Sequence, residues 1–391
     1  MINPLALQED LAAQLPEFLR DLEALVNVDC GTYDKAGVDR TAGWMRDRFG
    51  DWGWSVERFP QEKYGDCYYA TKRGRGAARV FMIGHSDTVY PQGTCAVRPM
   101  RVAGGRVIGP GAGDMKAGLL AGLYAVRALE AAGADDYGEV NFFVNSEEEI
   151  GSPVSRDLYR KLVRGATAGL TLEAARENGD VVSARKAAGL GRIVVGGRSA
   201  HAGVEPHKGA NALVELGHQM VAAAALNGIS PGVTVSVGLA HGGTATNVVP
   251  DEAWADLDLR SPDQAGMDAL DAAFAMQAER LSVPGASVTI TTNWGFPPLV
   301  KTDATAWLVG LAQGVAARLG FEVSDAATGG ASDANWMGAE GVPVLDGLGP
   351  IAGAGHCANE FVVLDSIVPR TALLAGLIAE ISRSAGDRHA S

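Results

Sequence analysis

The chain has 391 residues, of which 47% are hydrophobic and 20% are charged, and this length exceeds what one ordinary hydrophobic core holds, so we expect more than one domain. Its formal net charge of −13 argues against nucleic acid or an anionic membrane as a partner, because both require clustered Lys and Arg. The four cysteines are widely spaced and too few for a disulfide scaffold, and the N-terminal segment has no signal-peptide pattern, so we expect a cytoplasmic protein.

The first part of the chain alternates apolar strands with amphipathic helices. The predicted helices span residues 11–28, 39–49, 115–133 and 152–166. The predicted strands span residues 55–60, 67–73, 79–85, 140–146 and 169–174. This alternation predicts an α/β fold with a largely parallel sheet covered on both faces, and active sites in such sheets lie at the carboxyl ends of the strands.

The order of elements changes near residue 188. Between residues 188 and 297 the predicted order is β-α-β-β-α-β, which is that of a ferredoxin-like unit. The α/β alternation then resumes through a helix, a strand and a last helix, over residues 302–320, 342–349 and 366–384. We therefore expect an α/β catalytic domain, formed by residues 1–187 and 298–391, with an α+β domain of residues 188–297 inserted in it.

Two motifs with an acidic residue occur within residues 1–187, one at the end of the predicted strand 79–85 and one just before the predicted helix 115–133. In GHSDTV, Asp87 can turn back to the far imidazole nitrogen of His85 and fix the tautomer of a metal-binding histidine. In GPGAGDMKAG the alternate glycines do not match a dinucleotide-binding loop, and Asp114 would repel a phosphate. The motif indicates a tight turn that presents Asp114 to the crevice of the sheet; the alternative is that Asp114 caps the helix 115–133.

The motif SEEEIGS places three glutamates directly after a buried strand. A solvated loop is the ordinary interpretation of such a run. A catalytic interpretation gives two of them different roles, with Glu149 as a metal ligand and Glu148 as an unligated carboxylate that transfers protons. Glu173 in LTLEA and His356 in GAGHCANE follow other apolar strands, and either residue alone could be an ordinary surface side chain.

Taken together, these residues predict a metal site, because the carboxyl ends of parallel strands meet at one edge of a sheet. Carboxylates and imidazoles are ligands for divalent cations. The expected ligands of two cations held side by side are His85, Asp114, Glu149, Glu173 and His356. With Glu148 beside them, such a pair would direct water against an amide or ester.

The ordered motifs GHSDTV, GPGAGDMKAG, SEEEIGS, LTLE, RSAHAG, TATNVVPDE, GGASDAN and GHCANE resemble those of the M20 family of dinuclear zinc exopeptidases and acyl-amino-acid hydrolases, above all its glutamate carboxypeptidase (carboxypeptidase G) branch. The resemblance implies that Asp114 bridges two zinc ions, with a cis peptide bond after it. It implies that His85 and Glu173 complete one zinc site, and that Glu149 and His356 complete the other. It also makes Glu148 the general base and Asp87 the residue that orients His85.

The resemblance assigns the inserted domain the roles of a lid and a dimerisation surface, which implies a homodimer. His201, in RSAHAG, would reach the neighbouring subunit's active site and stabilise the oxyanion. Asn247 and Arg260 would bind the free carboxylate of the substrate, a task that suits the two-pronged guanidinium.

These inferences predict a carboxypeptidase or dipeptidase that cleaves small peptides. The alternative within the same chemistry is an N-acyl amino acid amidohydrolase, and the alternative outside it is a metal-free binding module. Zinc is the expected metal, although cobalt and manganese also suit such mixed nitrogen and oxygen sites. Trp294 and Phe296, at the return from the inserted domain, favour an apolar substrate side chain over glutamate.

Overall fold

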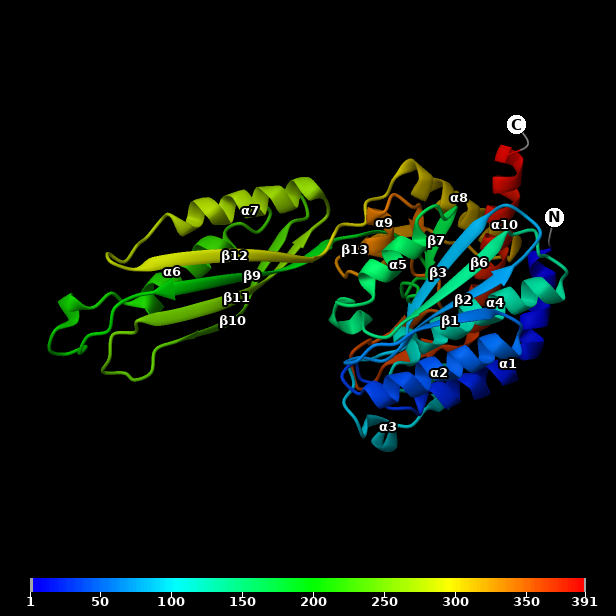
Figure 1. Cartoon of the computed structure of the whole chain (residues 1–391), viewed down its shortest axis with the longest axis horizontal. Coiled ribbons are helices and arrows are strands. Elements are labelled where there is room, and N and C mark those ends of the chain that lie inside the picture. The colour runs from blue at the N-terminus through cyan, green and yellow to red at the C-terminus, as the bar shows by residue number, and fades with distance from the viewer. Residues whose placement is uncertain (1–2, 390–391) are drawn as a thin grey trace. The chain divides into compact units, whose positions relative to one another are not determined.

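The computed structural model describes the backbone of residues 3–389 and the side chains of residues 3–385. The chain forms two compact units, each with its own core (Figure 1). The larger unit comprises residues 1–183, 301–327 and 332–391, and the inserted unit comprises residues 184–300 and 328–331. In the described part of the chain, no helix combines the length and the apolar character that a bilayer crossing requires.

The larger unit is built on a mixed sheet of six strands. In spatial order they are β1 (Ser55–Phe59), β2 (Cys67–Arg73), β6 (Glu139–Asn145), β3 (Arg79–His85), β7 (Ala168–Thr171) and β14 (Val344–Leu345). Strands β6, β3, β7 and β14 run parallel, whereas β1 and β2 are added antiparallel at one edge. The predicted α/β class is therefore confirmed, and the parallel strands all end at the same edge of the sheet.

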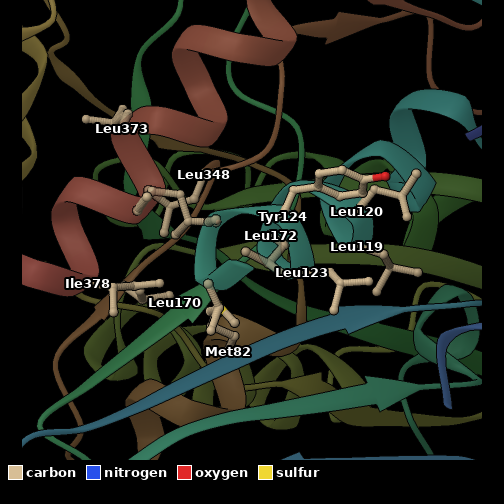
Figure 2. Packing of buried hydrophobic residues seen from close by; sticks show 14 of the residues in the cluster. Met82, Leu119, Leu120, Leu123, Tyr124, Leu170, Leu172, Leu348, Leu373 and Ile378 are labelled. Atoms are coloured by element: carbon tan, nitrogen blue, oxygen red, sulfur yellow. The ribbon is translucent and has the colours of Figure 1, made fainter. Parts of the chain in front are cut away.

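One face of this sheet is covered by long helices that pack against one another: α1 (Pro4–Val26), α4 (Ala117–Ala131), α8 (Asp303–Arg318) and α10 (Ile367–His389). Helix α4 is apolar on nearly every side, as expected of a helix enclosed by others. Figure 2 labels Leu119, Leu120 and Leu123 of α4 in the same buried cluster as Met82 of β3, Leu170 of β7 and Ile378 of α10. Helix α2 (Lys35–Asp51) joins this layer beside β1 and β2. Each fully buried side chain of this kind stabilises the fold by about 1.5–3 kcal/mol.

Two shorter helices cover the opposite face. Side chains alternate along a strand, so Phe143 of β6 points away from the α4 layer. The ring of Tyr159, in α5 (Arg156–Val163), lies 5.6 Å from the Phe143 ring. Helix α9 (Asp333–Ala339) packs against α5, β7 and β14. With both faces covered, the polar residues that follow the strands gather at the sheet's edge.

Several short elements were not predicted. They include α3 (Thr94–Val97), a small sheet of β4 (Arg101–Ala103), β5 (Arg106–Ile108), β15 (Ala352–Gly353) and β16 (Phe361–Val363), the pair β8 (Val181–Arg185) and β13 (Asp325–Thr328), and helix α9. Their two to seven residues are too few to show a hydrophobic period. The small sheet matters for the site, because β16 leads out of the loop that carries His356.

The inserted unit has the predicted β-α-β-β-α-β order. Its elements are β9 (Ala187–Gly196), α6 (Ala212–Ala224), β10 (Thr234–Gly242), β11 (Glu252–Ser261), α7 (Gln264–Ala278) and β12 (Ser287–Phe296). The strands form one antiparallel sheet in the order β10-β11-β9-β12, and both helices contact it. Alternate residues of β9 and β11 are buried against the helices, which leaves the other face of the sheet for contacts outside this core.

Trp294 has a different role from the one expected. Its ring packs against the core of the inserted unit, and its indole Nε1 donates to the Asp271 carboxylate at 3.2–3.3 Å. A side chain held in this way is part of the fold of its own unit. The preference for an apolar substrate that was inferred from Trp294 therefore loses its basis.

Candidate metal centre

Four of the predicted site residues of the larger unit lie at or shortly after the carboxyl ends of parallel strands. His85 is the last residue of β3 and is buried. Glu148 and Glu149 lie in a 3₁₀ turn (Glu148–Ile150) directly after β6, and Glu173 lies two residues after β7. His356 lies in the loop between β15 and β16 and adopts a left-handed conformation with φ 62°. Non-glycine residues in that conformation cluster at functional sites.

Asp114 lies between the two histidines. Its Oδ1 is 3.0 Å from Nε2 of His85, and its Oδ2 is 3.2 Å from Nε2 of His356. Two further carboxylates complete the arrangement: Glu173 Oε1 lies 3.8 Å from His85 Nε2, and Glu149 Oε2 lies 3.1 Å from His356 Nε2. The structure thus brings together all five of the predicted ligands, with one oxygen of Asp114 facing each histidine.

These separations fit shared cations. Two ligand atoms bonded to one tetrahedral Zn²⁺ at about 2.0–2.1 Å lie about 3.3–3.4 Å from each other. The four separations in the structure, between 3.0 and 3.8 Å, bracket that value. Two overlapping groups have ligand atoms within 4.8 Å of one another: His85 with Glu148 and Glu173, and His85 with Asp114 and Glu149. The residues present therefore suit two neighbouring divalent cations.

The raised pKa values of His356 and Glu149 also indicate that this cluster of carboxylates needs positive charge. Hydrogen bonds to Asp114 and Glu149 raise the pKa of His356 to about 10. Burial raises the pKa of Glu149, and its Oε1 is buried without a hydrogen-bond partner. An unpartnered carboxylate oxygen among other carboxylates is costly, since each repels the next. A divalent cation would satisfy that oxygen and offset the repulsion.

Glu148 lies within the same cluster, with a carboxylate oxygen within 4.8 Å of ligand atoms of His85 and Glu173. Burial raises its pKa well above the ordinary value; His85 opposes this effect, whereas the carboxylates of Glu173, Asp333 and Glu149 add to it. A carboxyl group with a raised pKa next to a cation pair is suited to accept and return a proton near neutral pH.

Asp87 connects the histidine to the glutamates. His85 Nδ1 lies 3.0 Å from the Asp87 carbonyl oxygen and 3.3 Å from its Oδ1, which leaves Nε2 for the cation side. The Asp87 carboxylate also accepts the backbone N–H groups of Glu148 and Glu149, at 3.2 and 3.3 Å. It therefore orients the imidazole and holds the turn that carries both glutamates.

The GPGAGDMKAG segment forms a tight turn. Gly111 adopts φ 71°, an irregular turn follows over Ala112–Lys116 in which Asp114 and Met115 have non-helical dihedral angles, and the Asp114–Met115 peptide bond is cis, as the family resemblance implied. Helix α4 begins only at Ala117, so the alternative in which Asp114 caps that helix is wrong.

Two groups next to the site were not predicted from the sequence. The Thr32 hydroxyl donates to Asp87 Oδ2 at 2.6 Å. Asp333 accepts hydrogen bonds from Asn145, Ser152 and Tyr159 behind the glutamate turn. The motif GGASDAN contained the signal for Asp333, but a buried Asp in a motif does not reveal which side chains it holds.

The remaining predicted residues lie in the inserted unit. His201 Nδ1 accepts the backbone N–H groups of Gly203 and Val204, each at 3.2 Å, so its proton resides on Nε2, where it can be donated. The carbonyl of Asn247 accepts the N–H of Ala202, so the segments of His201 and Asn247 are adjacent. Arg260 is bound through Nε and Nη2 to Asp258, at 2.9 and 2.8 Å. That contact uses two of the five guanidinium donors.

Comparison with known proteins also finds a family of peptidases. The family model of peptidase family M20/M25/M40 matches residues 81–380. Carboxypeptidase G2 of Pseudomonas sp. (strain RS-16) is 28% identical over 373 residues, which cover 94% of this chain and 89% of that protein. Succinyl-diaminopimelate desuccinylase of Methylobacterium radiotolerans is also 28% identical, over 368 residues that cover 87% and 90% of the two chains.

The fold has close counterparts among solved structures. The aminopeptidase PepT from Bacillus cereus superposes with a TM-score of 0.80 at 25% sequence identity, covering 94% of this chain and 98% of that chain.

The geometry predicts that the purified protein binds two equivalents of zinc and that removal of the metal lowers its thermal stability. Because the cations bind only the folded site, a free concentration of 100 times Kd adds about 2.7 kcal/mol of stability. Equilibrium dialysis with metal analysis, and melting of the chelated and reloaded protein, measure both effects. One equivalent, or identical melting of the two forms, would contradict the site described above.

Proposed function

The chain belongs to peptidase family M20/M25/M40, and from this premise we propose that it is a dinuclear-metal hydrolase that cleaves an amide bond next to an amino acid with a free carboxylate, as a carboxypeptidase or dipeptidase does. The predicted family is thereby confirmed, and with it a hydrolase of the peptidase type. The observation that carries the dinuclear site of this proposal is the Asp114 carboxylate, which presents one oxygen to each of two histidines.

The proposed ligands divide around that carboxylate. Asp114 is shared, His85 and Glu173 complete one cation site, and Glu149 and His356 complete the other. Zinc is the proposed metal, and cobalt or manganese are the alternatives for the same ligands. When bound, such a pair lowers the pKa of a water molecule and polarises the carbonyl of the scissile amide.

The residues of the chain itself carry the proton transfers. Glu148 accepts the proton of the attacking water and later passes it to the departing nitrogen. Burial raises the pKa of Glu148, which strengthens it as the acceptor of the proton in the first step. Asp87 holds the turn that carries Glu148 and keeps the His85 ring in place throughout.

In this proposal the domain of residues 188–297 serves as the lid. His201 of one subunit donates its Nε2–H to the oxyanion in the neighbouring subunit's active site, a role supported by the acceptor position of its Nδ1. Asn247 and Arg260 bind the substrate's free carboxylate, and the guanidinium retains donors beyond those used by Asp258.

An N-acyl amino acid amidohydrolase is the second candidate. The similarity to a succinyl-diaminopimelate desuccinylase favours it, since that enzyme's name describes removal of an acyl group from an amine. Both candidates use the same cation site and the same base, and they differ only in which side of the amide is recognised.

The inserted unit also has a surface that suits a second copy of the chain. Strand β10 is an edge of the sheet, and edge strands present unpaired backbone groups. Helix α6 contacts β10 and exposes the apolar side chains of Leu213, Val214 and Val221. A twofold contact through this surface gives the proposed homodimer.

Replacement of Glu148 by Ala tests the mechanism. We expect turnover to fall by about 10²–10⁴-fold, because the proton acceptor is lost, while the protein still binds two equivalents of metal. Steady-state kinetics and metal analysis separate these effects. The matched control is Glu322→Ala, which removes an exposed glutamate and leaves both quantities unchanged. Activity of Glu148→Ala near that of the control would refute the assignment.

A substrate screen of matched pairs tests the recognition step. Dipeptides with a free C-terminal carboxylate are compared with their C-terminal amides and with N-acyl amino acids, in the presence of zinc or cobalt. We expect blocking of the carboxylate to lower kcat/KM by at least about 100-fold, because it leaves the carboxylate-binding groups unpaired. Cleavage confined to N-acyl amino acids selects the second candidate, and equal cleavage of free and blocked dipeptides contradicts carboxylate recognition.

The dimer is tested by adding charge to the apolar surface. Val221 is 73% exposed, and Val97 of the larger unit, at 80%, is the matched control. We expect the wild-type protein and Val97→Asp to sediment at twice the chain mass of 40.5 kDa, and Val221→Asp to sediment at that mass. A monomeric wild type, or a Val221→Asp variant that stays dimeric, would exclude this surface.

A further inference from the structure

The glycine-rich loop that carries Asp114 surrounds a carboxylate of the chain itself. Glu360 is only 2% exposed. Its Oε1 accepts the backbone N–H groups of Gly113 and Asp114, at 2.7 and 2.9 Å, and its Oε2 accepts that of Gly111 at 3.0 Å. Its backbone carbonyl accepts the N–H of Gly109 at 3.2 Å. The loop therefore forms an anion-binding nest that Glu360 fills.

The loop requires glycine in order to close around this carboxylate. Gly111 adopts φ 71°, a conformation that costs little only without a side chain. A Cβ at Gly113 would lie 2.6 Å from the Cβ of Ala352, which is closer than side chains approach. The alternate glycines thus let successive N–H groups converge on Glu360.

Glu360 also connects to the loop that carries His356. The Tyr90 hydroxyl lies 2.7 Å from Glu360 Oε2 and 2.8 Å from the carbonyl oxygen of Cys357, the residue after His356. The N–H of Glu360 donates to the same carbonyl at 3.2 Å. The loops of Asp114 and His356, far apart in the sequence, are therefore both tied to Glu360.

The acceptor capacity of the Glu360 carboxylate is filled by these contacts. A carboxylate has about four acceptor positions, and the N–H groups of Gly111, Gly113 and Asp114 occupy three of them. The Tyr90 hydroxyl lies at the fourth and shares its single proton between Glu360 and the Cys357 carbonyl. Glu360 is therefore not a metal ligand, although it lies next to the residue that is shared between the cations.

We propose that Glu360 is a positioning residue of the metal centre, which fixes the backbone of residues 111–114 and, with Tyr90, the His356 loop, so that the Asp114 carboxylate faces both histidines before any cation binds. This inference rests on the proposed function, since it assumes that Asp114 binds metal. Residues that orient metal ligands in this way typically contribute 10–100-fold to metal affinity.

The test compares Glu360→Gln with a matched control elsewhere in the chain. The amide of Gln keeps the shape of the side chain but has one acceptor oxygen in place of two. The control is Glu215→Gln, because Glu215 is also buried and accepts two backbone N–H groups, those of Ser282 and Val283, at 2.8 and 2.6 Å in the inserted unit. Zinc affinity is measured by competition with a chromogenic chelator, and the fold is monitored by melting of the metal-free proteins.

We expect zinc affinity about 10–100-fold weaker in Glu360→Gln and unchanged in Glu215→Gln. Tyr90→Phe removes only the hydroxyl link, so it should weaken affinity by about 2–10-fold, mainly at the site that uses His356. If Glu360→Gln does not fold, the zinc affinity of Tyr90→Phe is the test. An affinity about 2–10-fold weaker in Tyr90→Phe supports the proposal, and an unchanged affinity overturns it.

The outcomes separate this inference from the proposed function. Fewer than two zinc equivalents in the wild-type protein overturn both. Two equivalents in the wild type, with unchanged affinity in Glu360→Gln or an equal loss in Glu215→Gln, overturn only the role of Glu360.

Discussion

Repulsion between carboxylates at one edge of a sheet is the constraint on which the rest of this structure depends. Asp114 shares its two oxygens between His85 and His356, and the carboxylates of Glu149 and Glu173 lie beside the same two imidazoles. Acidic groups held this close need compensating positive charge, which divalent cations supply. Backbone N–H groups, buried hydroxyls and the ends of rigid strands hold the ligands in place against that repulsion.

The two units divide the proposed reaction between them. The parallel part of the larger sheet fixes the ligands and the base, because β3, β6 and β7 end at one edge and their register is set by a buried core. The inserted unit carries the groups proposed to recognise the substrate, including Arg260, which is partly engaged by Asp258. In this proposal the larger unit carries the chemistry and the inserted unit carries the substrate specificity.

The sequence was informative where a long periodic element ends in a residue with distinctive chemistry. Strand β3 and helix α4 were predicted from periodicity, and His85 from its position at the end of β3. Contacts between residues far apart in the sequence could not be predicted, because nothing in the local sequence indicates that Glu360 fills the loop of Asp114, some 246 residues away. Trp294 was misinterpreted because an aromatic residue in a motif looks the same whether it faces a ligand or its own core. Elements as short as β15 carry too few residues for a pattern.

The most direct test of the central claim is anomalous diffraction at the zinc edge from crystals of the zinc-loaded protein. The account predicts two anomalous peaks about 3.5–4 Å apart, one on each side of the Asp114 carboxylate, with His85 next to one and His356 next to the other. A single peak, or peaks bound by residues other than Asp114, would contradict it.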